Sequence, residues 1–517
     1  MSISQQRPWS GDFVADQLDV AIHSDPQSAV AVQDLVGLAL RRNPKRAHLL
    51  VSAVLAKHVP TEPALVMAAG ELLGAFVASE LALMPDDGGH PRTLPATGES
   101  SLTTAAAQLS AVLQGSPGKR HSAIAAFAET VAGLRTVVTD AVVLGYAETA
   151  TGLGRLVANS LGAYYLHSTR HATPSVVPVA GFEEGHSHAT SHALVPTDPH
   201  WLDGNGPVIL VDDELSTGST VINTIRELHA LVPHAVYVIA ALIDLRSSSD
   251  RARFDALATE LDCKIAVTAL GKGRVELAPD ILPRAAELIQ RLQPPASVSP
   301  VPAANPKPAG RLSVLELSSE DLTPVRSDRF GNISPPNAAD IDVIAKALSH
   351  LVGTHKCQGP LVVLGCEENM FLPLAVANTL ASLLPAGDVR FSTTTRSPIV
   401  ALDQSGYAIA GALSFASHDL THDGPGIRFA YNLNGTGQRP GTIVVFPEPG
   451  TSREDVLTGS TTPDRPGAGL QPLGLALAGI ADDVVLVLLP VDTPVRGNQP
   501  ANIHSSIPSS IDTEVTP

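Results

Sequence analysis

Apolar, β-branched runs alternate with amphipathic runs between residues 141 and 270. The alternation predicts strands at Ala141–Gly145, Ala163–His167, Pro207–Val211, Ala235–Asp244 and Lys264–Leu270. It predicts helices at Leu153–Leu161 and Ser219–Leu231, and in the second of these Val221, Ile222, Ile225 and Leu228 share one face. Nearly continuous apolar strands that alternate with helices favour an α/β fold, a parallel sheet with helices on both faces.

Changes in composition divide the chain into segments. Residues 1–35 have a mixed character and are expected to be an N-terminal leader, and residues 36–293 form the first domain. Residues 294–310 are rich in Pro and Ala, which is typical of an extended linker. Residues 311–495 form a second α/β domain, and the polar tail 496–517 is expected to be disordered.

The chain has 517 residues, of which 44% are hydrophobic, and a net charge of −17. Such a surface repels nucleic acid and anionic lipid, so we expect a small-molecule ligand. Acidic residues interrupt the apolar stretches Ala64–Met84 and Leu473–Val491, so these are interpreted as a buried helix and a buried strand rather than membrane spans. The three cysteines form no CxxC pair, which fits a reducing cytoplasm.

The most informative run is VILVDDELSTGST, from Val208 to Thr220. Four apolar residues predict a buried strand, Asp212 and Asp213 lie at its carboxyl end, and a short loop follows that opens a helix. Ligands of open α/β sheets bind at the carboxyl ends of the strands. Free backbone amides at the helix start favour a phosphate, and Gly218 allows it a close approach to the backbone.

This run resembles the phosphoribosyl pyrophosphate (PRPP) signature of type I phosphoribosyltransferases. The resemblance implies that Ser216, Thr217, Gly218, Ser219 and Thr220 bind the 5′-phosphate. Asp212 and Asp213 can accept hydrogen bonds from the ribose hydroxyls and offset positive charge on the sugar. The plainer alternative is a strand that ends in a capped helix with a solvated acidic turn.

A second strand–loop–helix unit lies upstream, in VVLGYAETATGLGRLVANSL. By resemblance its loop binds pyrophosphate through Glu148, Thr149, Ala150, Thr151 and Gly152, although an ordinary βα turn has the same pattern. Arg170, at the end of the next strand, is a candidate for a bidentate contact to pyrophosphate or a surface arginine.

The run FEEGHSHATSHAL contains His186, His188 and His192. Type I enzymes carry a flexible loop between these two motifs, so we interpret the run as a lid in which His186 and His188 have catalytic roles. A metal site and a plain surface loop are the alternatives.

The segment Arg41–Pro60 is predicted to contain a helix that carries Arg42, Lys45, Arg46, Lys57 and His58. A solvated helix face explains this basic segment. The functional alternative is a hood that supplies positive charge near the site.

Together these runs resemble the orotate phosphoribosyltransferase-like enzymes of bacterial tellurium-resistance gene clusters. Members carry a C-terminal TRSP domain named for a Thr-Arg-Ser-Pro motif, which here is Thr395–Pro398, and RFGNISPP and GCEENMFLPL also match. The resemblance implies Mg²⁺-assisted chemistry on PRPP, with Mg²⁺ held through PRPP and by Asp212 and Asp213 rather than by a dedicated protein site. It also implies a homodimer, which is common in the superfamily.

The two units also resemble each other. VLGYAETATGLGRLVANSL aligns with VLGCEENMFLPLAVANTL, HSTR with TTTR, and PVILVDDELSTG with TIVVFPEPG, in the same order. We expect the second domain to be a degenerate copy without PRPP binding, unless the similarity is chance. Such a copy either binds a different ligand through Glu367, Glu368 and Arg396 or covers the first site. This hypothesis requires a second parallel sheet with matching strand order.

We therefore expect a cytoplasmic phosphoribosyltransferase, a glycosyltransferase of the pentosyltransferase type, that acts on PRPP and an acceptor which the sequence does not identify. The alternatives are a non-catalytic PRPP or nucleotide regulator, a related enzyme that uses a ribose 5-phosphate ligand without pyrophosphate, and an interaction scaffold.

Overall fold

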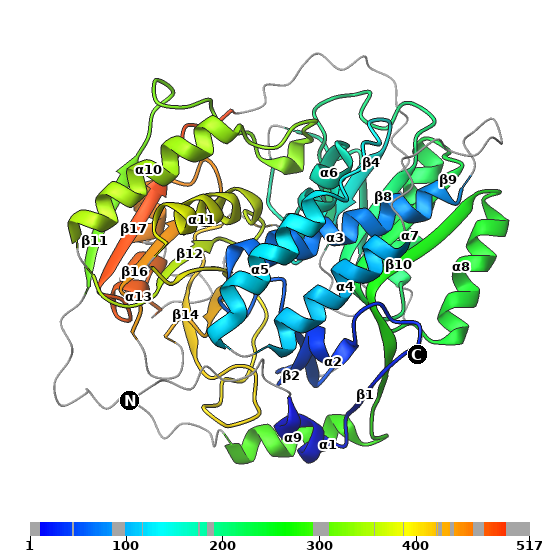
Figure 1. The fold of residues 1–517 in the computed structure, drawn as a ribbon, viewed down its shortest axis with the longest axis horizontal. Helices are drawn as coiled ribbons and strands as arrows, with labels where there is room; N and C mark the ends of the chain where they lie inside the picture. Colours follow the sequence, from blue (N-terminus) through cyan, green and yellow to red (C-terminus); the bar gives the residue numbers. More distant parts are fainter. Residues whose placement is uncertain are drawn as a thin grey trace, which may run out of the picture.

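A computed structural model describes residues 11–43, 46–84, 99–115, 117–173, 176–183, 191–292, 310–355, 357–385, 387–419, 421, 426–434, 439–458 and 470–492. The predicted linker lies almost wholly outside these residues, and the predicted tail lies wholly outside them. Two α/β units lie side by side, each built on its own sheet (Figure 1).

The first sheet has six strands in the order β1-β10-β9-β8-β4-β5. Its parallel strands are β4 (Val142–Gly145), β5 (Tyr164–His167), β8 (Val208–Leu215), β9 (Val236–Asp244) and β10 (Lys264–Glu276). These confirm the predicted strands, although β8 and β10 continue further. Residues ahead of the predicted first domain also join this unit, as α1 (Asp12–Leu18) and as β1 (Ala21–Ser24), which pairs antiparallel with β10.

Helices cover this sheet, and two of them confirm the helices that the periodicity predicts at Leu153–Leu161 and Ser219–Leu231. They are α2 (Val32–Leu35), α3 (Pro63–Ala82), α4 (Glu99–Gln114), α5 (Pro117–Ala132), α6 (Thr151–Leu161), α7 (Ser219–Leu231), α8 (Ser248–Glu260) and α9 (Ile281–Leu292). In the described part of the chain, α3 alone is long and apolar enough to cross a membrane, but 72% of its most apolar window is buried inside the protein. It packs against α5, α6, β9 and β10, as a core helix does.

Two antiparallel hairpins extend from the first unit. One joins β2 (Val36–Leu40) to β3 (His48–Ser52), and the other joins β6 (Ala180–Glu183) to β7 (Ser191–Leu194). The predicted helix in Arg41–Pro60 is therefore wrong. Leu49, Leu50 and Val51 pair with β2 instead, and β-branched and apolar residues suit such a paired, buried strand.

The second unit contains a five-stranded parallel sheet in the order β11-β17-β16-β12-β13. Its strands are β11 (Arg311–Glu316), β12 (Leu361–Gly365), β13 (Val389–Thr393), β16 (Thr442–Phe446) and β17 (Asp483–Leu488). The remaining elements are η1 (Asp328–Phe330), α10 (Ala338–His355), α11 (Phe371–Leu383), the hairpin β14 (Ala412–Ala416) and β15 (Ile427–Tyr431), α12 (Arg453–Leu457) and α13 (Leu473–Ala478).

The two sheets share a strand order over four strands. β5-β4-β8-β9 in the first corresponds to β13-β12-β16-β17 in the second, and an antiparallel hairpin lies at the same point of the chain in both. The sheets differ in the strand that follows these four. In the first sheet this strand is β10, which comes after β9 in the chain, whereas in the second sheet it is β11, which comes before the other strands of that sheet in the chain. The second sheet thus meets the condition that the repeat hypothesis set.

Candidate active site

The loop after β8 is built as the sequence predicts. Asp212 and Asp213 lie in the last half of β8, and α7 begins at Ser219. Gly218 has a φ of 70°, and a Cβ atom there would lie 2.5 Å from the Phe254 ring. Only glycine meets both demands, because a side chain would be strained and would also collide with the ring.

Hydroxyl groups and one unforeseen cation line this loop. Thr217 Oγ1 and Ser219 Oγ lie 3.1 Å apart, and both terminal nitrogens of Arg253 donate to Ser219 Oγ over 3.2 Å. Ser216 to Thr220 are all half-buried, so the loop is open to solvent on one side. The local motif does not reveal Arg253, because this residue lies in α8. The position of α8 after β9, the neighbour of β8, is the signal that points to it.

The acidic pair has a perturbed protonation equilibrium. Burial and the neighbouring Glu214 raise the pKa of Asp213 to about 6. Asp212 Oδ1 accepts a hydrogen bond from the Asp213 amide over 2.9 Å. Arg46 lies in the turn of the β2–β3 hairpin, and its Nη2 lies 2.5 Å from Glu214 Oε1. The basic segment therefore does supply charge near the site, as its functional alternative required.

The loop after β4 lies beside the acidic pair. Its Tyr146 is buried, and burial together with the Asp212 charge raises the pKa of the phenol. The peptide bond between Ala147 and Glu148 is cis. Ser168 Oγ accepts a hydrogen bond from the Ala147 amide over 2.9 Å, which joins this loop to the end of β5.

A buried ion pair joins the loop after β4 to the segment between β3 and α3. Lys57 Nζ lies 2.6 Å from Glu148 Oε1, and the two side chains are 2% and 6% exposed. Burial opposes ionisation of Glu148, but Lys57, Arg396 and Arg170 outweigh it and lower the pKa to about 2. The same ammonium also acts to lower the pKa of Asp213, against the larger effects of burial and Glu214, so its charge acts on both the predicted pyrophosphate loop and the acidic pair.

Arg170 belongs to a polar chain that reaches the lid segment. Its Nη2 lies 3.1 Å from His192 Nε2, and His192 Nδ1 lies 3.0 Å from Ser168 Oγ. His192 is buried on β7, which places one histidine of the His-rich run against the site. His186 and His188 lie outside the described residues.

The second domain covers the loop after β4. Glu368 accepts hydrogen bonds from the Thr151 hydroxyl through its carbonyl (2.9 Å) and from the Arg170 amide through its carboxylate (2.7 Å). A Cβ atom on Gly152 would lie 2.9 Å from the Met370 Cβ. Of the predicted pyrophosphate residues in this loop, Thr149 is half-buried, whereas Glu148, Ala150, Thr151 and Gly152 are buried.

Arg396 of the Thr-Arg-Ser-Pro motif reaches across the same interface. Its Nε lies 3.2 Å from Glu367 Oε2 and 3.7 Å from Glu148 Oε2. The next residues of the motif meet the first domain as well, since the Arg42 amide donates to the Pro398 carbonyl over 3.1 Å. The motif that names the second domain therefore contacts the predicted pyrophosphate loop.

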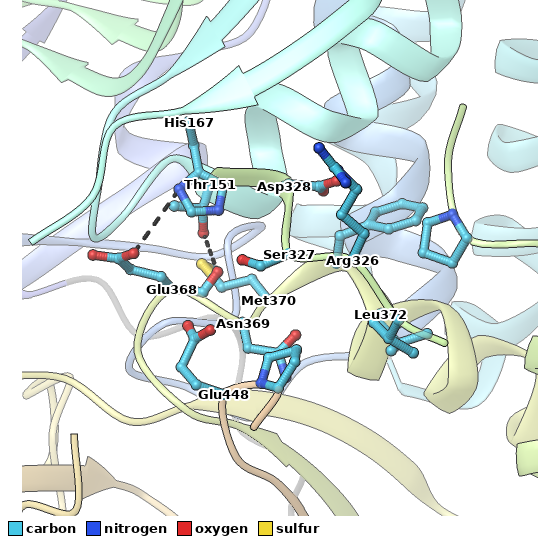
Figure 2. Close-up of a pocket in the computed structure, with 14 residues that line it drawn as sticks. Thr151, His167, Arg326, Ser327, Asp328, Glu368, Asn369, Met370, Leu372 and Glu448 are labelled. Atoms are coloured by element: carbon cyan, nitrogen blue, oxygen red, sulfur yellow. Dashed lines mark hydrogen bonds and ion pairs between the residues drawn. The ribbon is translucent and has the colours of Figure 1, made fainter. Parts of the chain in front are cut away.

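A cavity of about 30 Å³ lies at this interface and is lined by His167, Asp328, Glu368 and Glu448 among others. Figure 2 shows the Glu448 carboxylate pointing toward Glu368, and His167 facing Glu368 from the other side. Asp328 accepts a hydrogen bond from Arg155 Nε over 2.9 Å. Of the two roles considered for Glu367, Glu368 and Arg396, the contacts favour cover of the first site, because Glu368 and Arg396 contact the first domain and Glu367 pairs with Arg396.

Comparisons with known proteins agree with this arrangement. Residues 35–274 match the family model PRTase_2, described as a phosphoribosyl transferase. Residues 326–460 match a model described as a TRSP domain C-terminal to PRTase_2. A search of the curated proteins finds no match.

Among solved structures, similar chains include adenine phosphoribosyltransferase from Trypanosoma brucei in complex with AMP, pyrophosphate and ribose-5-phosphate. It has 14% identity and a TM-score of 0.20, and the match covers 25% of this chain and 56% of that one. The Giardia lamblia enzyme complexed with 9-deazaadenine has 21% identity and a TM-score of 0.20, with 27% and 74% covered. Orotate phosphoribosyltransferase from Aeropyrum pernix has 17% identity and a TM-score of 0.15, with 25% and 60% covered.

The two family models account for most of the chain, in the order that the two sheets have in the fold. The domain at residues 35–274 belongs to the phosphoribosyltransferases, which are pentosyltransferases, and it is followed by the TRSP domain that accompanies the transferase domain in this family.

Proposed function

We propose that the chain transfers a phosphoribosyl group from PRPP to an acceptor by displacement at ribose C1. The loop between β8 and α7 is the observation that carries this proposal. It combines an acidic pair at the end of a central strand, a glycine with a left-handed backbone, four hydroxyl groups in the loop and the first helical turn, and Arg253. This combination suits a ribose 5-phosphate group.

Each part of the loop has a separate role in the proposal. The 5′-phosphate binds to Ser216–Thr220 and to Arg253, whose guanidinium supplies the countercharge. Asp212 and Asp213 accept hydrogen bonds from the ribose hydroxyls. As the bond to the leaving group lengthens, positive charge grows at C1, and the nearby carboxylates stabilise it. Positioning and electrostatics supply the rate, and no covalent nucleophile is needed.

The residues at the end of β8 fit a divalent cation. Asp212, Asp213 and Glu214 are adjacent, and burial among like charges raises the pKa of Asp213 to about 6. A bound Mg²⁺ would neutralise charge on the departing pyrophosphate. In this proposal Lys57, Arg170 and Thr149 bind that group on the protein side, and the ion pair with Glu148 orients Lys57. His186 and His188 are assigned to a lid that excludes water from the site.

A second candidate is a non-catalytic PRPP or nucleotide regulator. The burial of Glu148, Ala150, Thr151 and Gly152 under the second domain favours it, because these residues were expected to cradle the pyrophosphate. The resemblance to enzymes of tellurium-resistance gene clusters suggests a biosynthetic pathway linked to that resistance.

The first experiment is a calorimetric titration of the full chain with PRPP, with and without Mg²⁺. Binding should require Mg²⁺ and disappear in the Asp212→Asn/Asp213→Asn variant, while Asp255→Asn, an exposed acid on α8, should bind like the parent. Binding that survives in the double variant, or no binding to the parent, would refute the proposed site. Release of pyrophosphate during an acceptor screen then separates the transferase from the regulator.

A further inference from the structure

Three ligand-forming side chains from both domains lie close together, and two of them, Glu368 and Glu448, also line the cavity of Figure 2. His171 follows β5 in the first domain, whereas Glu368 and Glu448 follow β12 and β16 in the second. Each therefore comes from a loop at the carboxyl end of a strand, where the two sheets face each other. None of the three has a role in the proposed transfer reaction.

The geometry of this cluster is close to that of a metal site. His171 Nε2 lies 4.0 Å from Glu368 Oε1 and 3.9 Å from Glu448 Oε1, and the three donor atoms lie within 4.8 Å of one another. The three residues are only 5%, 3% and 6% exposed. Ligands about 2.0–2.2 Å from a common ion would need only small shifts from these positions.

Two of the donor atoms lack a partner. His171 Nε2 and Glu448 Oε1 are buried and form no hydrogen bond with any described residue. Leaving buried polar atoms unsatisfied costs about 1–3 kcal/mol each, so such atoms point to a missing ligand.

The surrounding groups hold the three side chains in place. Glu448 accepts a hydrogen bond from Arg329 through its other oxygen, Oε2. Glu368 accepts hydrogen bonds from the Thr169 hydroxyl (2.6 Å) and the Arg170 amide (2.7 Å). Such outer contacts orient metal ligands in known sites.

We propose that His171, Glu368 and Glu448 bind a first-row divalent cation, of the Zn²⁺ or Mn²⁺ type, that ties the two domains together. One imidazole and two carboxylates favour these ions over Mg²⁺ or Ca²⁺, which prefer oxygen ligands alone. The adjacent cavity of about 30 Å³ has room for a water molecule as a further ligand. This site is separate from the Mg²⁺ proposed to act with PRPP at Asp212 and Asp213.

The test is titration of the full chain, freed of metal with a chelator, with Zn²⁺ and with Mn²⁺ in the absence of PRPP. We expect one cation per chain and a higher melting temperature, because an ion that binds the folded state alone stabilises it. Glu448→Gln should weaken binding by at least about tenfold. The metal-free variant is melted beside the metal-free parent, so that a loss of folding is distinguished from a loss of cation binding. The exposed Glu454 provides the matched control, Glu454→Gln.

Two further variants separate this site from the others. Binding should persist in Asp212→Asn/Asp213→Asn and in His186→Ala/His188→Ala, and the Mn²⁺ complex should show nitrogen coupling from one imidazole that disappears in His171→Gln. Affinity unchanged in Glu448→Gln and His171→Gln, or lost with the Asp212 or His186 pair, would place the cation elsewhere. Absence of any binding would also overturn the proposal.

Discussion

The loop after β8 and the loop after β16 occupy the same place in two sheets of matching strand order. The first offers half-buried hydroxyls and backbone amides at the start of a 13-residue helix. The second contains Pro447 and Pro449, which have no amide proton to give, and its Glu448 is buried against Arg329. Loops at matching places in the two sheets therefore differ in their side chains: one is the phosphate-binding loop that we propose, and the other forms a contact between the domains.

The loops after β4 and β12 show the same contrast in charge. Arg396 of the second domain approaches Glu148 of the first, and Glu368 of the second accepts the Arg170 amide of the first. Each domain thus supplies an arginine to a glutamate of the other. Within the described residues, however, only the first domain has a buried lysine, Lys57. Burial and Asp419 raise the pKa of Glu367, whereas the cations around Glu148 lower its pKa to about 2.

The largest expected effect comes from removing that lysine. Lys57→Met should lower the free energy of unfolding by about 3–5 kcal/mol, because it leaves Glu148 buried without its nearest countercharge. Urea denaturation measures this change. Lys57→Met/Glu148→Leu should recover most of the loss, and Lys264→Met, at an exposed position, should have little effect. An equal loss in the double variant would show that the pair is not what stabilises the loop.

The two glycines of the β8 and β16 loops test the comparison next. Gly218→Ala should lower the free energy of unfolding by about 2–4 kcal/mol, because the alanine would adopt a left-handed backbone conformation and its Cβ would overlap with the Phe254 ring. Gly450 has a φ of 93°, and a Cβ atom added there would have no described neighbour within 4 Å, so Gly450→Ala should cost only about 1 kcal/mol. Thermal or urea unfolding of the two variants side by side gives the difference, and equal losses would contradict it.

Asp213 should show the cost of a functional carboxylate. The pKa of its carboxyl group is about 6 in the folded chain, whereas the ordinary pKa of an aspartate, which applies to the unfolded chain, is 3.8. Ionisation of Asp213 therefore opposes folding. The penalty is absent below about pH 4, grows between pH 4 and 6 and is complete above pH 6. Asp213→Asn should therefore stabilise the chain by about 1–2 kcal/mol at pH 7.5 and by nothing at pH 4, while PRPP binding is lost. Stabilisation that is the same at both pH values would exclude this explanation.

The smallest expected effect concerns Arg253. Because its guanidinium is half-exposed and screened by solvent, Arg253→Ala should weaken PRPP binding by about tenfold, with little change in unfolding. Calorimetric titration measures the affinity, and Arg251→Ala, on the same helix and exposed, is the control. Equal effects of the two substitutions would remove Arg253 from the phosphate site.

Local patterns predicted the parts of the site that are continuous in sequence. The strand, acidic pair, loop and helix of Val208–Leu231 lie as expected, because their spacing alone sets their geometry. The contributions of Lys57, Arg253 and Met370 depend on which loops the two sheets bring together, and no local spacing records that. The helix predicted in Arg41–Pro60 failed for a related reason, since the pairing of β3 with β2 overrides local preference.

The contacts between β2 and the second domain have a consequence for synthesis of the chain. The Leu40 amide donates to the Tyr407 hydroxyl over 2.8 Å, across 367 positions, and the Phe13 amide donates to the Gly406 carbonyl over 3.1 Å. At about 5–20 residues per second, a ribosome needs on the order of tens of seconds to make the distant partner. During that time the apolar β2–β3 hairpin has left the ribosome without its final cover, and transiently exposed apolar surface of this kind favours aggregation.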